Sequence, residues 1–599
     1  MPTTYAGFTA LPGGMNSGLN PLSLKATEFA RGNNVSVRNG FVETRGGYVQ
    51  EFDLTSFGAG FRGAEILRLN GGDWFVAVIG TAVIFYSFDL GTSYSFGGVF
   101  PAGTGWCYFE QADRWIVIQS GVDRPAVYEI NALNVPFLYG RNPNAVSLVK
   151  ATVMQYLHGR LFMVPVNVPS LNPDSTALPY AIPDDDLAAG PGRVTFCAAD
   201  VRDNLNPEYL FLMSEHRIVA QGGVLTLPAE SGFIEGMAEL RGAATGTGVG
   251  PLIVFGREVV NAFDVAIPRP QWFSTNIGQV LFRGAGTKSS RGIVPVNDDL
   301  VYLDTEGQVR FMRYDKSQLA GSGGVLSNTP KSNEMRYWIG QQDLAYLSEV
   351  SATFSDNRFF WTLVGQSGPY YRALGVLDVA PAYTMAAQEP PAYYGVWTGF
   401  KFLQVLEARK SDARRMFCVV QARDTSLRIL RYDPEAVTDP TNTPILSTVV
   451  TGVYNFAVEG KTVATQIKRL SYCEMWLGNL KRDTTIRVYY RPYGYPVWQS
   501  FGSKDLQVPG GPAQYRRGVK ISLDLSTQEC DDVAQKPLHI GDRFEFMIRW
   551  RGFARIEMFR VVADLVAEED PDVCETDNES LEEYPVDTLD PDFDYEVLL

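Results

Sequence analysis

Residues 73–88 read DWFVAVIGTAVIFYSF, two apolar runs separated by Gly80-Thr81-Ala82. Each run has the length of a β-strand, and the glycine-containing break between them indicates a turn. The stretch therefore predicts an antiparallel hairpin. Residues 113–130, DRWIVIQSGVDRPAVYEI, follow the same plan with a break at Ser120–Asp123.

This hairpin pattern recurs along the chain. Further pairs of runs lie at 251–265, 298–313, 358–379 and 415–433, and HGRLFMVP at 158–165 begins in the same way. The starts at 73, 113, 158, 251, 298, 358 and 415 give a loose period of about 40–60 residues, which is typical of propeller blades. The interval after 158 is close to two of the shorter spacings, and GRVTFCAAD at 192–200 is expected to supply the missing unit.

The units carry no known blade signature: the WD dipeptide, the kelch Gly-Gly spacing and the S-x-D-x-G-x-T-W box are absent from the sequence. A degenerate β-propeller therefore competes with a set of unrelated β-sandwich hairpins, and the spacing favours the propeller. Helical segments are expected only at 22–30 and 333–347.

The pattern changes at about residue 451. Residues 484–501 and 543–566 alternate polar and apolar side chains over long runs, as strands with one buried face do. The predicted fold is mainly β, with a degenerate β-propeller body followed by an antiparallel β-sandwich and an acidic tail. The predicted segments are 1–50, an N-terminal arm and opening hairpin; 51–450, the body with a long loop at about 166–192; 451–566, the sandwich; and 567–599, the tail.

The opening hairpin is predicted from VSVRNGFVET at 35–44. Asn39-Gly40 tolerates positive φ at both positions, which a type I′ turn requires. Glycine-rich stretches flank the hairpin on both sides, and they indicate an arm that latches the propeller or touches a partner. Arg45 is the residue expected to make the anchoring contact.

The acidity of the chain is concentrated at its end. The formal net charge is −15, but residues 568–599 hold fourteen Asp or Glu and no Lys or Arg, which leaves the rest at about −1. Proteins that grip nucleic acid through phosphates need a basic excess, and none is present. The tail is expected to be an arm that orders on a neighbouring subunit, with a merely solubilising role as the alternative.

Residues suited to chemistry are scarce. Of the three histidines only His216, in SEHRIV, has a serine and an acid beside it, and a surface role is the simpler interpretation. Gly246–Gly250 precedes a strand rather than opening a helix, so it predicts a loop and not a phosphate site. Asp184–Asp186 lacks the glycine of a calcium loop. We therefore predict no catalytic, cofactor-binding or metal-binding residue and no enzyme.

The targeting signals are also weak. No run of about 18 apolar residues is present, and the start MPTTYAGFTALPGG lacks a basic-then-apolar pattern, so neither a spanning helix nor export is expected. The six cysteines are scattered without a CxxC pair, which fits synthesis in a reducing cytoplasm.

The N-terminal motifs resemble the tail-nozzle proteins of tailed phages, the family of tail tubular protein B in short-tailed phages. The resemblance begins with Gly13-Gly14-Met15-Asn16, continues through Asn33-Asn34 and ends the hairpin with Arg45-Gly46-Gly47, where the family has R-P-G. Later pieces are Val122-Asp123-Arg124-Pro125, His158-Gly159-Arg160-Leu161, the segment 297–310 and Asp356-Asn357-Arg358, so the resemblance spans about residues 8–435.

This resemblance implies a structural virion protein without catalysis, made in the bacterial host cytoplasm. It implies a propeller body, a homo-oligomeric ring of commonly six copies, contact with the tail adaptor and other tail proteins, and a lumen through which double-stranded DNA passes without sequence-specific binding. The candidate interaction residues are Gly13, Gly14, Asn33, Arg45, Gly46, Arg124, Pro125 and Arg160, with Phe593 and Tyr595 in the tail.

Two alternatives stay open. One is a packaged-DNA stabilisation or plug protein of the tail, which uses a similar body. The other is a carbohydrate-active or lectin-like propeller, either a glycosidase or a host-receptor binder. The latter requires two or three carboxylates beside aromatic side chains on one propeller face.

Overall fold

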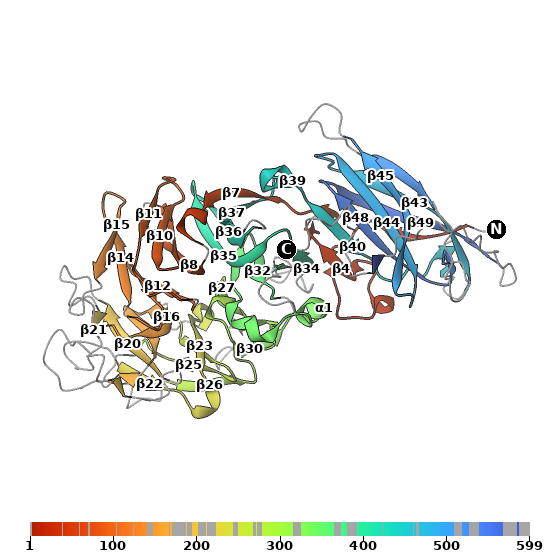
Figure 1. Ribbon diagram of the computed structural model, residues 1–599. Coiled ribbons are helices and arrows are strands. Elements are labelled where there is room, and N and C mark those ends of the chain that lie inside the picture. Colours follow the sequence, from red (N-terminus) through yellow and green to blue (C-terminus); the bar gives the residue numbers. More distant parts are fainter. Residues whose placement is uncertain are drawn as a thin grey trace.

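The computed structural model describes residues 3–38, 40–58, 60–69, 72–103, 105–123, 125–140, 148–166, 168–169, 187–188, 195–201, 211–212, 223–243, 249–267, 271, 278–315, 325–364, 373–379, 392–422, 425–458, 461–462, 466–507, 518–525, 538–566 and 584–585. The chain is mainly β, with a propeller body and a β-sandwich beside it (Figure 1). Within these residues α1 (Arg336–Ile339) is the only α-helix, and no helix is long and apolar enough to span a membrane.

The body is a ring of antiparallel sheets, the blades of a propeller. Its strands are β7 (Gly47–Asp53), β8 (Phe61–Leu69), β9 (Gly72–Ile79), β10 (Ala82–Ser87), β11 (Ser93–Phe96), β12 (Tyr108–Ala112), β13 (Trp115–Gln119), β14 (Ala126–Ile130), β15 (Pro136–Gly140), β16 (Ala151–Leu157), β17 (Arg160–Pro165), β20 (Thr195–Val201), β21 (Phe211–Leu212), β22 (Gly223–Thr226), β23 (Ile234–Glu239), β24 (Leu252–Gly256), β25 (Val259–Phe263), β26 (Gly278–Arg283), β27 (Ile293–Val296), β28 (Asp299–Leu303), β29 (Val309–Asp315), β30 (Val325–Pro330), β31 (Ala352–Ser355), β32 (Arg358–Thr362), β33 (Leu374–Asp378), β34 (Ala392–Trp397), β35 (Lys401–Lys410), β36 (Ala413–Gln421) and β37 (Leu427–Asp433).

Five blades are separate four-stranded sheets: β8 to β11, β12 to β15, β23 to β26, β27 to β30, and β35 to β37 with β7. Two further units of the described chain have the same plan, namely β16-β17-β20 with β21 and β22, and β31 to β34, which continues into a larger sheet. The first strands contact one another in the order β8, β12, β16, β23, β27, β31 and β35, and β35 contacts β8 again. The ring is therefore closed.

The six hairpins predicted from paired apolar runs are confirmed as the second and third strands of blades. The further unit expected at 192–200 is wrong, because β20 pairs with β17 as the third strand of the same blade. The wide interval after residue 158 comes from the long connection between these two strands. Of the loop at 166–192, only 166, 168–169 and 187–188 are described, and 168–169 pairs with 187–188.

Strand β7 closes the ring from the other end of the sequence. It precedes the first blade in the chain but forms the fourth strand of the last blade, pairing with β37 so that Tyr48 lies opposite Tyr432. The backbone ladder between β7 and β37 thus holds the first and last blades together.

The sandwich consists of two sheets. Its strands are β1 (Thr3–Phe8), β4 (Arg31–Asn33), β5 (Val35–Ser36), β6 (Val42–Thr44), β40 (Leu446–Val450), β41 (Ala457–Val458), β42 (Lys461–Thr462), β43 (Lys468–Gly478), β44 (Thr484–Pro492), β45 (Val497–Leu506), β46 (Val519–Asp524), β47 (Ile540–Gly541), β48 (Phe544–Arg551), β49 (Arg555–Leu565) and β50 (Tyr584–Pro585). Consecutive strands β48 and β49 lie in different sheets, with the order β40-β48-β44-β45-β50 in one and β1-β49-β43-β46 in the other. Phe546 of β48 and Phe559 of β49 pack with ring centroids 5.7 Å apart.

Residues 1–50, expected to form an arm and a hairpin, are built into both parts where they are described. β1 and β6 pair with β49, and β4 pairs with β40 on one side and with β34 of the sixth blade on the other. One sheet therefore runs from the blade strand β31 through β4 to β50 of the sandwich. A single apolar core, which includes Val301, Trp397 and Ile548, extends through both parts.

The opening hairpin forms, with Val35 opposite Thr44, but its turn differs from the prediction. Gly40 has a φ of 80°, and its N–H donates to the carbonyl of Val37 at 2.8 Å. The closing bond thus joins residues 37 and 40, whereas a turn centred on Asn39-Gly40 would join 38 and 41; Asn39 itself lies outside the described residues.

The structure contradicts one of the two expected helices and confirms part of the other. A helix at 22–30 is wrong: this segment holds a 3₁₀ turn at Pro21–Ser23, capped by the Asn20 side chain, and the strand β3 (Glu28–Phe29), which pairs with β2 (Gly14–Met15). Strand pairing thus overrides the local helical preference. The segment 333–347 is helical in part, with α1 between the 3₁₀ turns Asn333–Met335 and Leu344–Glu349.

Candidate functional site

The structure brings three of the candidate interaction residues, Asn33, Arg45 and Gly46, together at the junction of propeller and sandwich. Arg45 is fully buried, and all of its N–H groups have partners. Its Nη1 and Nη2 donate to the two carboxylate oxygens of Asp439 at 2.9 and 2.8 Å. The other donors reach Asn34 Oδ1 at 2.9 Å and the carbonyls of Gly46 and Thr398 at 2.8 and 3.0 Å. We call this group the Arg45 clamp.

The partners in the Arg45 clamp come from three segments of the chain, with Gly46 and Asn34 both in the N-terminal one. Asn34 follows β4, Thr398 follows β34, and Asp439 lies in the connection from the last blade to β40. Asn34 also donates to Thr398 Oγ1 at 2.9 Å and to the Leu446 carbonyl at 2.8 Å. The clamp therefore joins the N-terminal segment, the sixth blade and the entrance to the sandwich.

The electrostatics of the Arg45 clamp favour the ion pair. Burial lowers the pKa of Arg45, but the Asp439 carboxylate together with Tyr48 and Tyr432 outweighs it, and the pKa is raised above its ordinary value. The guanidinium also lies over the Tyr48 ring, with its carbon 4.7 Å from the centroid. Because Arg45 has no exposed surface, it anchors the chain to itself and offers nothing to a partner.

The remaining described candidates make contacts within the chain. Gly14 has a φ of 72°, and a Cβ there would lie 2.5 Å from the carbonyl oxygen of Tyr393. Gly13 is exposed, and its N–H donates to the Thr27 carbonyl at 2.9 Å. Pro125 is buried before β14, and Arg160 donates to the Val265 carbonyl at 3.0 Å, joining two blades. Arg124, Phe593 and Tyr595 lie outside the described residues.

A second ionic group links the opening hairpin to the sixth blade. Arg38 Nη1 lies 2.6 Å from Asp356 Oδ2, and its Nε lies 3.2 Å from Asp378 Oδ2. Asp356 Oδ2 also pairs with Arg358 Nη2 at 2.6 Å. The Asp356-Asn357-Arg358 motif thus serves the same junction as the Arg45 clamp.

Polar side chains on the first strands join neighbouring blades, a feature that the apolar runs of the second strands did not predict. Gln404 exchanges two hydrogen bonds with the backbone of Ala64, at 2.9 and 2.7 Å, and Gln111 does the same with Arg68, at 2.8 Å each. Glu110 Oε1 accepts from the Tyr156 N–H at 2.7 Å. These amide and carboxyl groups replace the ladder bonds that the splayed first strands cannot make.

Glu110 and Glu65 lie on the adjacent first strands β12 and β8, and their carboxyl groups influence each other electrostatically. Burial, assisted by the Glu65 carboxylate, raises the pKa of Glu110 from its ordinary 4.5 to about 8. Burial also raises the pKa of Glu65, whose Oε1 accepts from the Ile66 N–H at 2.8 Å. One oxygen of each carboxyl is thus engaged with the backbone.

The raised pKa of Glu110 makes stability depend on pH. The folded chain holds this proton more tightly than the unfolded chain, so the stability is fully present below pH 4.5 and falls as the pH rises toward 8. Glu110→Gln is expected to raise the free energy of unfolding at pH 8 by ~1–2 kcal/mol and to leave it unchanged at pH 4.5. Urea unfolding at both pH values measures the difference, and an equal effect at the two would contradict the assignment.

Side chains suited to metal or nucleophilic chemistry are dispersed. Among the described side chains, no three His, Cys, Asp or Glu lie close enough together to hold a metal ion. Cys107, Cys418 and Cys473 are buried and free, and burial raises the pKa of the Cys107 thiol to about 11. His158 lies in the turn before β17, whereas His216, Asp184–Asp186 and Gly246–Gly248 lie outside the described residues.

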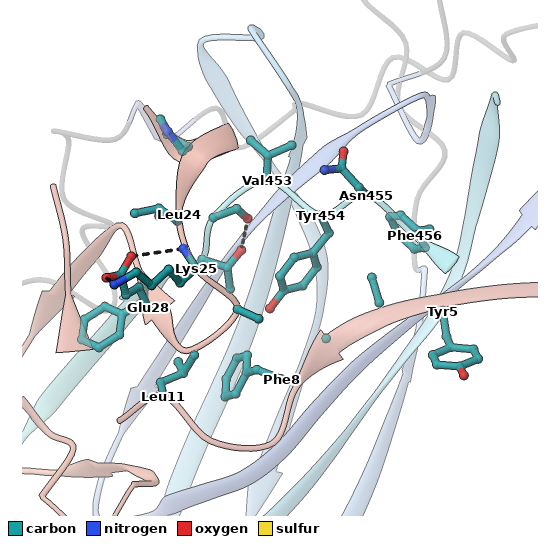
Figure 2. A pocket seen from close by; sticks show the side chains of 17 residues that line it. Tyr5, Phe8, Leu11, Leu24, Lys25, Glu28, Val453, Tyr454, Asn455 and Phe456 are labelled. Atoms are coloured by element: carbon teal, nitrogen blue, oxygen red, sulfur yellow. Dashed lines mark hydrogen bonds and ion pairs between the residues drawn. The ribbon is translucent and has the colours of Figure 1, made fainter. Parts of the chain in front are cut away.

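A groove lies on the sandwich side of the junction, between β1, the segment 21–29 and the connection 451–456 (Figure 2). It has a volume of about 280 Å³. Its apolar lining comprises Phe8, Leu11, Leu24, Phe29, Tyr454 and Phe456. Figure 2 shows Phe8 and Leu11 of the N-terminal stretch and Tyr454 of the connection 451–456 directed into the same hollow. We call it the N-terminal groove.

Comparison with protein-family models found no match, and comparison with curated proteins found none. Among solved structures, similar chains include the Swd1 β-propeller domain of Myceliophteria thermophila (8% identity, TM-score 0.34, covering 65% of this chain and 100% of that one). A chain of the mitotic checkpoint complex has 13% identity, a TM-score of 0.35 and coverage of 66% and 95%. The WD40 repeats of RRP9 have 7% identity, a TM-score of 0.34 and coverage of 65% and 100%. Sequence identities and TM-scores this low carry no information about function. The propeller assignment rests on the strand order and on the closed ring of first strands.

Proposed function

We propose that this chain is a structural subunit of a bacteriophage tail, part of the nozzle or neck/tail-tube ring through which DNA leaves the capsid. The proposal rests mainly on the position of the motifs that resemble the family. Asn33-Asn34, Arg45-Gly46-Gly47 and Asp356-Asn357-Arg358 all meet at the junction of propeller and sandwich. The motifs thus serve cohesion of the chain rather than a reaction.

Two further features support this proposal. A conduit for sliding DNA should bind phosphates weakly, and the first 567 residues have a net charge of only about −1. The continuous sheet through β4 holds the propeller and the sandwich in one frame, which suits a subunit of an assembly under mechanical load. The virion role, the ring and its copy number of commonly six come from the family resemblance.

Assembly provides the test. Recombinant protein viewed by electron microscopy should form rings, or enter them when the tail adaptor is added, and mass spectrometry should find the chain in purified particles of the phage that encodes it. An amber mutation in the gene should yield filled heads without a functional tail. A stable monomer that is absent from purified particles would overturn the proposal.

The carbohydrate-active alternative has its own measurement. The carboxyls of Glu65 and Glu110 are engaged with backbone N–H groups, which favours a structural role for them. Purified protein should therefore release no reducing sugar from host polysaccharide. Release that is abolished by Glu110→Gln would replace the structural proposal with a glycosidase.

A further inference from the structure

The N-terminal groove is apolar inside and open at its mouth. Phe8, Leu11 and Phe456 are almost fully buried at its floor, whereas Tyr5 at the rim is 52% exposed. The Lys25 side chain at the mouth is 70% exposed, with its Nζ 3.6 Å from Glu28 Oε1. An apolar hollow with the exposed Lys25 side chain of the Lys25–Glu28 pair at its mouth suits a segment that combines apolar and acidic side chains.

The acidic tail has such a segment. Residues 592–599 read DFDYEVLL, in which Phe593, Tyr595 and Val597 alternate with Asp592, Asp594 and Glu596. In an extended conformation the apolar side chains lie on one face and the acidic ones on the other. Phe593 and Tyr595 can then enter a hollow while the carboxylates face solvent and Lys25.

The path of the chain leads from the sandwich edge toward the groove. β50 pairs antiparallel with the start of β45, Tyr584 opposite Trp498 and Pro585 opposite Val497. This antiparallel register directs the end of β50 toward the turn at 493–496. There the Tyr493 hydroxyl lies 3.4 Å from the side-chain amide of Asn20, the residue before Pro21 of the groove. Trp498 also shares an apolar cluster with Leu24.

We infer that residues 593–599 occupy the N-terminal groove of their own chain, with Phe593 and Tyr595 as the anchoring side chains. The seven residues 586–592 can span about 23 Å when extended, and they start opposite Val497, four positions from Tyr493, whose hydroxyl contacts Asn20 at the edge of the groove. A tether this short gives the segment an effective concentration in the millimolar range, which favours its own groove over that of a second copy. This inference is independent of the virion role.

Photo-crosslinking in the full-length chain tests the placement. With p-benzoylphenylalanine at position 593, irradiation should join this residue to 5–29 or 451–456. An equal mixture of ¹⁵N-labelled and unlabelled protein shows whether the segment in the groove belongs to the same chain or to a second copy. Crosslinks within one chain carry matched labels only, whereas crosslinks between copies carry matched and mixed labels in about equal amounts. Mixed labels in about half of the crosslinked peptides, or crosslinks spread over other surfaces, would overturn the inference.

Two substitutions sharpen this experiment. Ala26→Glu adds a negative charge at an exposed position of the groove and should lower the crosslink yield at least fivefold. Leu133→Glu, at a residue of the second blade that is 81% exposed, should leave the yield unchanged. Circular dichroism and thermal melting confirm that both variants are folded. An unchanged yield in Ala26→Glu would also overturn the inference.

Discussion

Arg45→Ala is expected to lower the free energy of unfolding by ~3–5 kcal/mol, because it leaves the buried Asp439 carboxylate without its partner. The substitution also removes the donors to Asn34, Gly46 and Thr398. The N-terminal segment, the sixth blade and the connection to the sandwich then lose the side chain that joins them. Denaturant unfolding followed by tryptophan fluorescence measures the change, with the midpoint and slope both recorded.

Arg414→Ala is the matched control for this prediction. Arg414 is an arginine in an ion pair too, with its Nη1 3.4 Å from Glu407 Oε2, but its side chain is 73% exposed. The same substitution there should cost less than ~1 kcal/mol. Similar losses in the two variants would show that the Arg45 clamp contributes no more than a surface pair.

Gly395→Ala is expected to lower the free energy of unfolding by ~2–4 kcal/mol. Gly395 lies in β34, where the sixth blade meets β4, with a φ of 100°; a Cβ there would lie 2.2 Å from the carbonyl oxygen of Gly32. The methyl group would force β4 away from β34. Since this pairing links propeller and sandwich, amide exchange of β4 and β34 should rise more than that of β9 and β10.

Gly80→Ala is the control that measures the cost of a positive φ without a steric clash. Gly80 has a φ of 57° in the turn between β9 and β10, and no heavy atom lies within 4 Å of its Cβ position. Alanine there should cost only ~1 kcal/mol and leave exchange at the junction unchanged. If the two glycine variants lost the same stability, backbone strain alone would explain Gly395.

The blades were predictable where the sequence pattern is local. Second and third strands such as 74–79 and 82–87 are apolar, fully or nearly buried and joined by a short turn, so both strands and their break can be recognised in one stretch. First strands such as β8 and β12 mix glycine, charge and apolar residues because their polar side chains join neighbouring blades. They have no periodicity of their own. The third blade was misassigned because its second and third strands are separated by a long insertion.

The junction was not predictable because its partners are far apart in the sequence. Arg45 stands in a glycine-rich stretch that is typical of a surface loop, yet it pairs with Asp439, 394 positions away. Gly46 has a local reason to be glycine, since a Cβ would lie 2.5 Å from the Asp433 carbonyl oxygen, but that contact is also remote in the sequence. The sequence marks Arg45 as a candidate contact, and the three-dimensional structure is needed to show where it lies.

The pairing of β1 with β49 has a consequence for how this protein is made. Thr3 lies opposite Asp564, so β1 leaves the ribosome 561 residues before the strand with which it pairs. At about 5–20 residues per second, that delay is on the order of half a minute to two minutes. During this time the apolar side chains of β1 lack the partner strand β49, and a chaperone that binds extended segments would find its target there.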